Sequence, residues 1–468
     1  MASVREPLDR ALRGWWRDHA REELARWRGD ADASSVAVRT RRHAALAGPG
    51  VRDAFLESHE RGLLPASEIH ALADWLRRAM TAPARLAARR DRLAWSRAAV
   101  PHDSDWHSLE TLMTRIEREP RVRERRALSR SVSASMAEGL TLWARRRERL
   151  EESAEKAAWL TPFLPLPEAP TEAPSLASTN DAWHELRERL AHAANTTVES
   201  WEDVLFVLRA PRLDDAVPAR RRWRRIAEGL GPLRPPLAEH ARAEPEASLG
   251  HGLLVVRERV DVRVHSGRER GVFSEREACL AMGRAFAAVT THPATPESLA
   301  RPRQGAVGWL IGALLAHRLA EPSFVDKSLG LEGRPRRAVA ELALGIELAE
   351  ARVHAAWRSV EGHVGDRDFP ERARAALVHA LGVDVTEAAA ALTLKTHRPE
   401  RGRALSLAPR VYVSLREQVD EDWWRNPRAE EVLRSATAHG DAGTVAGLLD
   451  GLPPIPDDAG PRIAELLG

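Results

Sequence analysis

The sequence predicts a mostly α-helical fold with one small β-hairpin or sheet. Of its 468 residues, 43% are hydrophobic and 30% are charged, which allows a large buried core and argues against disorder. Apolar residues recur every three to four positions along most of the chain, as on the buried face of a helix. Segments 253–256 and 260–264 instead have the short, β-branched character of paired strands. We therefore expect a large helical body with a small β element near 253–265.

The first 160 residues form the predicted N-terminal helical region. An apolar stripe from Leu8 to Trp27 indicates that the chain opens with an amphipathic helix, and similar stripes occur at 69–76 and 109–116. The segment 161–180 contains five prolines, which remove backbone donors that a helix needs. We expect this segment to be a Pro-rich linker or loop.

Residues 181–468 form the second predicted region. A helix begins at Asn180 or Asp181, since either side chain can cap it. After the small β element, the helical pattern returns beyond Phe273 and includes a long helix near 336–361.

The charge is nearly balanced overall but uneven along the chain. Lys and Arg number 71 and Asp and Glu 68, whereas residues 1–150 carry a net charge of +9 and the remainder −6. The densest basic runs, 121–126 and 145–149, alternate with glutamates, which is typical of a solvated, self-neutralising helix face. We do not expect nucleic-acid binding. An adaptor that binds an anionic partner through this basic N-terminal half is an alternative.

Composition and missing motifs exclude several kinds of site. Cys279 is the only cysteine, so the chain has no internal disulfide and no zinc site built on cysteines. No apolar run is long enough for a membrane span, and the charged N-terminus is unlike a signal peptide, so we expect a cytoplasmic protein. The sequence has no Gly-rich phosphate loop and no intact His-Glu-x-x-His motif. The cluster His102-Asp-Ser-Asp-Trp-His107 suits the start of a helix better than a metal site.

The later part of the chain contains a recognisable order of features. A strand at 261–264 leads into a helix with Gly283, Ala285 and Phe286, and the sequence Asp-Trp-Trp-Arg-Asn-Pro follows at 422–427. This order resembles the thimet-oligopeptidase/oligoendopeptidase-F-like zinc metallopeptidases, the helical gluzincins, and the tail is similar to that of bacterial members. The resemblance covers roughly 261–440. It implies an oligopeptidase-like helical body in which the β element lies beside the former active-site helix.

The same resemblance implies where the zinc site of these peptidases would lie in this chain. Alignment on Gly283 places the first zinc histidine at Leu280, the general-base glutamate at Ala281 and the second histidine at Arg284. The third ligand of the family, a glutamate on the next helix, falls at Val307. All four functional residues are replaced, so the chain is expected to be a degenerate member that lacks the zinc-binding motif.

The replacements cannot perform the chemistry of the residues they replace. Leu280 and Val307 have no lone pair to donate, and Arg284 brings a permanent positive charge to the place of a dication. Ala281 cannot accept a proton from water. We therefore expect no catalytic residue, no metal and no cofactor. The sequence predicts a pseudoenzyme, not a peptidase, with a protein- or peptide-binding or scaffolding role and no membrane association.

Four side chains are candidates for binding a partner: Arg284, Trp309, His397 and Tyr412. Arg284 could bind a peptide carboxylate, or it could form an internal ion pair with a carboxylate such as Glu275 or Glu277. A further alternative is an enzyme with a relocated, non-standard metal site, for which the scattered candidates are His251, His265, His292 and His317.

Overall fold

The computed structural model describes residues 5–438 with several gaps. The residues outside the description are 1–4, 28–42, 44–45, 47, 165–175, 177–178, 220–221, 223–224, 227–230, 232–236, 238, 245–251, 258–259, 266–268, 293–294, 296–305, 365, 396, 421 and 439–468. Most of the predicted Pro-rich linker at 161–180, and also His251, lie outside the described residues.

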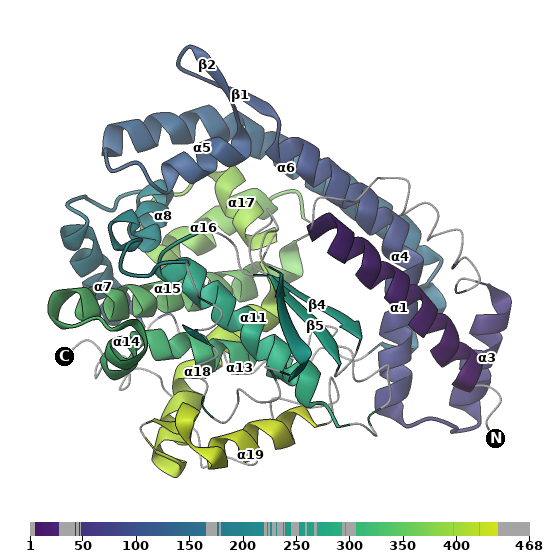
Figure 1. Cartoon of the computed structure of the whole chain (residues 1–468). Helices are drawn as coiled ribbons and strands as arrows, with labels where there is room; N and C mark the ends of the chain where they lie inside the picture. Colours follow the sequence, from purple (N-terminus) through teal and green to yellow (C-terminus); the bar gives the residue numbers. More distant parts are fainter. Residues whose placement is uncertain are drawn as a thin grey trace.

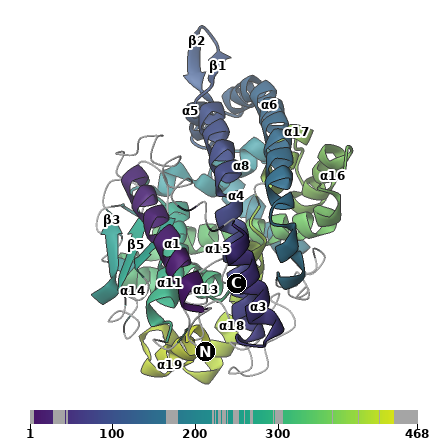
Figure 2. The same cartoon turned by 90° about the vertical axis from the view of Figure 1, so that its right-hand side faces the viewer.

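The N-terminal region is helical, as predicted, and two long helices dominate it. Helices α4 and α6 pack against each other along one side of the molecule, and α1 lies on the same side (Figure 1; Figure 2). The elements of this region are α1 (Arg5–Trp27), α3 (Pro49–Glu60), α4 (Ala66–Ser96), β1 (Ala99–His102), β2 (Asp105–Ser108), α5 (Leu109–Ile116), α6 (Val122–Glu155) and the 3₁₀ helix η2 (Ala158–Phe163).

The rest of the chain is also mainly helical. Its helices are α7 (Asn180–Ala193), α8 (Trp201–Arg209), α11 (Val272–Thr290), α13 (Ala306–His317), α14 (Pro322–Leu329), α15 (Gly333–Val360), α16 (Phe369–Leu381), α17 (Glu387–Lys395), α18 (Pro399–Gln418) and α19 (Pro427–Thr437). Its 3₁₀ helices are η3 (Pro211–Leu213), η5 (Arg318–Ala320), η6 (Glu361–His363) and η7 (Trp423–Arg425), and its strands are β3 (Ala241–Glu244), β4 (Gly252–Arg257) and β5 (Asp261–His265). The long helix expected near 336–361 corresponds to α15.

A small three-stranded sheet lies beside α11, where the sequence predicts the β element. Strand β5 is central, and it pairs with β4 in antiparallel and with β3 in parallel orientation. The side chains of Val255, Val262 and Val264 are buried in the main core. Trp16 of α1 donates its indole N–H to the carbonyl oxygen of Val255 at 3.2 Å, which ties the N-terminal helix to this sheet.

The segment 99–108 corrects the expectation that the His102–His107 cluster starts a helix. It forms an antiparallel hairpin of β1 and β2, which projects from the body of the molecule in Figure 1. Asp103 makes the turn with a φ of 54°, a conformation that Asp tolerates better than most residues. The helix start comes later, where Ser108 caps α5 by accepting a hydrogen bond of 3.1 Å from the backbone N–H of Thr111.

The cap of α7 also differs from the prediction. The residue before the helix is Thr179, whereas Asn180 and Asp181 lie in its first turn. None of the helices in the described part of the chain combines the length and the apolar character that a bilayer crossing needs.

The buried core is divided unevenly between the two parts of the chain. The main cluster is built from α7 onward and has α11, α13, α15 and α18 at its centre. Two smaller clusters lie in the N-terminal region, one beneath α1, α3 and α4 and the other between α5 and α6. The predicted zinc positions therefore lie in the most thoroughly packed part of the molecule.

Candidate functional site

Helices α11 and α13 carry the four degenerate positions, the residues at which the resemblance places the zinc site, and these helices pack backbone against backbone. Gly283 of α11 lies against Gly312 of α13, and a Cβ atom on Gly312 would come within 2.6 Å of the carbonyl oxygen of Leu280. Gly308 lies against the backbone of Arg284 at one turn's distance along the same interface. Small residues at these positions let the two helices approach closely. The two adjacent helices that the resemblance implies are therefore present in the structure as α11 and α13.

The four degenerate positions lie on these two neighbouring helices, and three of them hold apolar residues of the buried core. Leu280, Ala281 and Val307 are buried, with 1%, 5% and 3% of their surface exposed. Arg284 is half-buried, and its guanidinium carbon lies 4.4 Å from the ring centroid of Trp309, a cation–π contact. Arg284 and Trp309, two of the four binding candidates, therefore contact each other.

The two carboxylates considered as internal partners of Arg284 are bonded to other arginines. Glu275 accepts hydrogen bonds from Arg222 at 2.9 Å and from Arg225 at 2.8 Å. Glu277 accepts a hydrogen bond of 2.9 Å from Arg401 of α18. Both carboxylates are thus used to hold α11 against segments that are distant in sequence.

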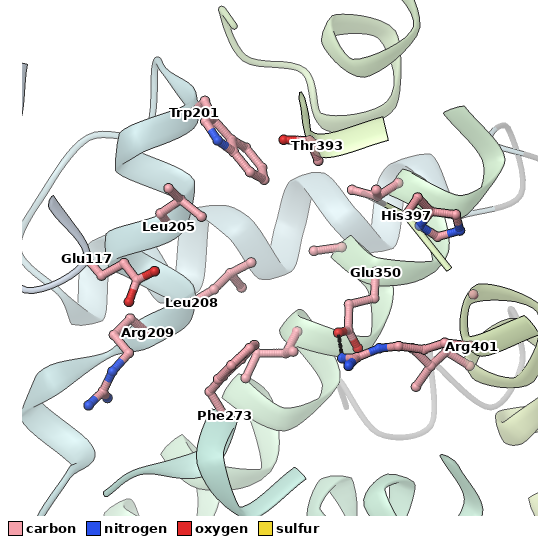
Figure 3. Close-up of a pocket in the computed structure, with 15 residues that line it drawn as sticks. Glu117, Trp201, Leu205, Leu208, Arg209, Phe273, Glu350, Thr393, His397 and Arg401 are labelled. Carbon is pink, nitrogen blue, oxygen red and sulfur yellow. Dashed lines mark hydrogen bonds and ion pairs between the residues drawn. The ribbon is translucent and has the colours of Figure 1, made fainter. Parts of the chain in front are cut away.

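A cavity of about 290 Å³ lies at the N-terminal end of α11, away from the four degenerate positions. Helices α8, α15, α17 and α18 surround it, and Phe273 of α11 and Glu117, just after α5, complete its wall (Figure 3). The wall is mainly apolar, with side chains from Trp201, Leu205, Leu208, Phe273, Ile346, Val353 and Leu405. Of the sequence-based binding candidates, His397 lines this cavity.

Most charges around the cavity are paired within the protein. Arg209 donates to both carboxylate oxygens of Asp214, at 2.5 and 3.0 Å. Arg401 bonds to Glu277 and Glu350, and Figure 3 shows the Arg401–Glu350 pair on the opposite side of the cavity from Glu117. Burial by itself lowers the pKa of Arg401, but the two carboxylates outweigh burial and raise the pKa above its ordinary value.

His397 belongs to a histidine pair that stays uncharged. Its Nε2 lies 3.0 Å from Nδ1 of His354, and the two rings stack at 5.2 Å between centroids. Burial, followed by nearby arginines, lowers the pKa of His354 to about 4. Burial and the neighbouring His354 lower the pKa of His397 to about 3. At neutral pH the pair can therefore offer one N–H and accept one hydrogen bond, but it carries no charge.

Tyr412, the fourth binding candidate, lies in the core and not at the cavity. Its ring is 1% exposed and contacts His317, Trp423 and Trp424 edge-on or tilted. Burial raises the pKa of its hydroxyl. Trp423 and Trp424 are themselves buried and anchor the Trp-Trp-Arg-Asn-Pro segment to the end of α18.

Of the histidines proposed for a relocated metal site, His292 and His317 have described side chains, and these two do not come together at a metal site. Nδ1 of His317 is buried and lies 3.0 Å from both carboxylate oxygens of Glu347, in a network that includes Arg276. His292 is exposed, and its backbone N–H bonds to the carbonyl of Ala438. Within the part of the chain that the structure describes, no group of three or more His, Cys, Asp or Glu side chains is arranged to hold a metal ion.

The donor set at the degenerate positions also fails to fit a catalytic zinc ion. Such an ion needs three nitrogen, oxygen or sulfur ligands and one open coordination position. Leu280 and Val307 offer hydrocarbon side chains, and Arg284 offers a cation whose charge already lies over Trp309. These four residues therefore do not suit the metal that the fold would imply.

Sequence reasoning missed most of the cavity wall. Glu117, Glu350 and Arg401 come from segments far apart in the chain, and no local motif links them. The available signal was the spacing of Ile346, Glu350 and Val353 on the expected long helix, because residues four and three positions apart share a helix face.

By sequence, the chain matches no protein-family model and no curated protein. By structure, it is similar to an M32 carboxypeptidase from Deinococcus radiodurans, with a TM-score of 0.54, 14% identity and coverage of 99% of this chain and 98% of that one. It is similar to metallocarboxypeptidase 1 of Trypanosoma cruzi, with a TM-score of 0.57, 11% identity and 99% coverage of both chains. A protein described as an oligoendopeptidase F from Bacillus anthracis aligns at a TM-score of 0.55 and 11% identity, over 92% of this chain and 81% of that one. The chain therefore has the helical fold of these gluzincin-like peptidases, as the resemblance predicted, and carries apolar residues and an arginine where that resemblance places the metal.

Proposed function

We propose that this chain is a catalytically inactive, peptidase-like protein that binds a peptide, or a peptide segment of a protein, in the cavity between α8, α15 and α18. Peptidase activity in this fold would need a metal and a base at the α11–α13 pair. The observation that carries the proposal is that Leu280, Ala281 and Val307 are buried apolar residues and that the fourth position is the cation of Arg284, so none of these four side chains can bind a metal ion.

The composition and the volume of the cavity support a role in peptide binding. Its wall combines large apolar side chains with a small number of polar groups, the composition typical of ligand sites, and its volume is near the lower end of their range. Phe273 is 38% exposed at the start of α11, so an apolar surface is presented to solvent at this place. A peptide side chain that packed there would remove this surface from water.

The experiment combines turnover and binding. The purified protein is incubated with an unstructured peptide library in the presence of Zn²⁺ or Mn²⁺, and mass spectrometry detects cleavage. Calorimetry with the same peptides measures binding. We expect measurable binding and no cleavage that depends on added metal, because no residue at the degenerate positions can hold the ion.

Two tryptophan substitutions test whether peptides bind in the cavity. Leu205→Trp fills the cavity and should weaken peptide binding by at least tenfold. Val260→Trp adds the same bulk at an exposed turn outside the cavity and should leave binding unchanged. Metal-dependent cleavage that a chelator abolishes would disprove inactivity, and absence of any peptide binding would disprove the binding role.

The alternative of an anionic partner gains no support from α6. Several arginines of the basic runs are held by carboxylates, including Arg126 by Glu199, Arg147 by Glu151 and Arg149 by Asp91. The Arg147–Glu151 pair is of the kind that the alternating sequence predicts, whereas Arg126 and Arg149 pair with carboxylates from other segments of the chain.

A further inference from the structure

Glu117 differs from the other charged groups that line the cavity. The guanidinium groups of Arg209 and Arg401 are each held by carboxylates of the protein. The side chain of Glu117 forms no hydrogen bond and no ion pair with any described residue, although it lines the cavity wall. The charged group that remains available to a ligand in the cavity is therefore the negative carboxylate of Glu117.

Ligand binding would relieve the poor environment of Glu117. Burial is the main factor that raises the pKa of its carboxyl, and the nearby Glu269 raises it further, against the weaker opposing effects of Arg209 and Arg118. A carboxylate that is partly removed from water without a partner is costly, and a cation brought by a ligand would offset that cost. A nearby cation would therefore stabilise the carboxylate of Glu117 more than it would stabilise a solvated glutamate.

The neighbours of Glu117 determine what else the ligand carries. Leu205, Leu208 and Trp201 of α8 belong to the same wall, and Phe273 faces them across the space in Figure 3. A ligand that fills this cavity and reaches Glu117 brings a cationic group and an apolar group together in the same space. The free amino terminus of a peptide does this, because its ammonium and its first side chain are attached to the same carbon atom.

We propose that the cavity recognises the free amino terminus of a peptide that begins with a large apolar residue, with Glu117 accepting the ammonium and the α8 wall holding the side chain. This inference rests on the proposed function, since it names the ligand of the same cavity. The peptide carboxyl terminus fits less well, because Arg401 is already bonded to Glu277 and Glu350 and Glu117 would repel a carboxylate.

Calorimetry with matched tripeptide amides tests the assignment. Phe-Ala-Ala amide should bind the full-length protein, and its N-acetylated form should bind at least tenfold more weakly. An N-acetylated Ala-Phe-Lys amide carries its ammonium on the lysine side chain instead, and it should also bind at least tenfold more weakly than the free tripeptide. Tight binding of this lysine peptide together with weak binding of the free tripeptide would overturn the amino-terminal assignment.

A substitution ties the effect to Glu117. Glu117→Gln keeps the shape of the side chain and should weaken binding of the free tripeptide by about the same factor as acetylation does. It should leave the affinity for the acetylated tripeptide unchanged. Glu110→Gln removes an exposed glutamate of α5 and serves as the matched control, with thermal melts confirming that both variants fold. Equal affinity for free and acetylated tripeptides, lost on Leu205→Trp, would overturn this inference and leave the proposed function standing. Absence of binding by every peptide would overturn both.

Discussion

A fully buried ion pair joins Arg125 of α6 to Asp203 of α8, with both side chains 0% exposed. Arg125 donates to Oδ1 of Asp203 at 2.7 and 3.1 Å, and the guanidinium lies 4.3 Å from the ring of Phe206. Asp203 also accepts from the backbone N–H of Ser200 through Oδ2, which completes the cap of α8. The pair therefore fixes the wall of the cavity to the N-terminal region.

Removal of this arginine should be costly because it leaves the buried Asp203 carboxylate without its cationic partner. We expect Arg125→Leu to lower the free energy of unfolding by about 3 to 5 kcal/mol, measured by urea denaturation. Arg147→Leu breaks an exposed pair with Glu151 on the same helix and should cost about 0.5 kcal/mol or less. Equal effects of the two variants would contradict the role assigned to the buried pair.

The histidine pair predicts how stability depends on pH. Because the pKa values of His354 and His397 are lowered to about 4 and about 3, the unfolded chain binds protons at these residues before the folded chain does as the pH falls below about 6.5. The contribution of this pair to stability is therefore fully present above that pH and declines as the pH falls toward 4. Between pH 7.5 and 5, the lowered pKa of each histidine should reduce the free energy of unfolding by about 2 kcal/mol.

Unfolding measured at these two pH values checks the prediction. His397→Gln should show a smaller loss of stability on acidification than the unaltered protein. His363→Gln, which changes an exposed histidine bonded to Asp366, should retain the full loss. A pH dependence that His397→Gln does not reduce would contradict the uncharged pair.

At the scale of elements, the contact between α11 and α13 depends on glycine. We expect Gly312→Ala to destabilise the protein by about 3 kcal/mol, because the added Cβ would meet the Leu280 carbonyl oxygen at 2.6 Å and backbone atoms cannot move aside cheaply. Gly50→Ala places the same methyl group on α3 with no atom within 4 Å and should be neutral or slightly stabilising. Comparable losses in the two variants, measured by thermal unfolding, would show that α11 and α13 are not in close contact.

The strands show which sequence patterns predict secondary structure and which do not. Strands β4 and β5 were predictable because they contain β-branched residues, of which Val255, Val262 and Val264 are buried in the core. The β1–β2 hairpin was not, since β2 contains mostly polar residues and Trp106 is 71% exposed, so β2 shows no alternating pattern of burial. Strand β3 was not predicted because its sequence Ala-Arg-Ala-Glu has no β-branched residue.

At the scale of the whole molecule, the fold is retained where sequence identity has nearly vanished. The solved peptidases align over 92% to 99% of this chain at only 11% to 14% identity. The order of strand, helix pair and Trp-Trp tail was enough to predict this architecture. The cavity was beyond sequence reasoning, because its wall joins Glu117 to residues near 200, 350 and 400, and these meet only after α8, α15 and α18 have packed.

The central claim is that this peptidase fold has lost the ability to hold a hydrolytic metal ion, and zinc titration tests it most directly. Zinc binding is measured by calorimetry for the unaltered protein and for the quadruple variant Leu280→His, Ala281→Glu, Arg284→His and Val307→Glu, with circular dichroism confirming that the variant folds. We predict no specific zinc binding by the unaltered protein and binding of about one zinc ion per chain by the variant, because the restored imidazoles and carboxylates supply the missing donors. Stoichiometric zinc binding by the unaltered protein, or no gain by the folded variant, would contradict the account.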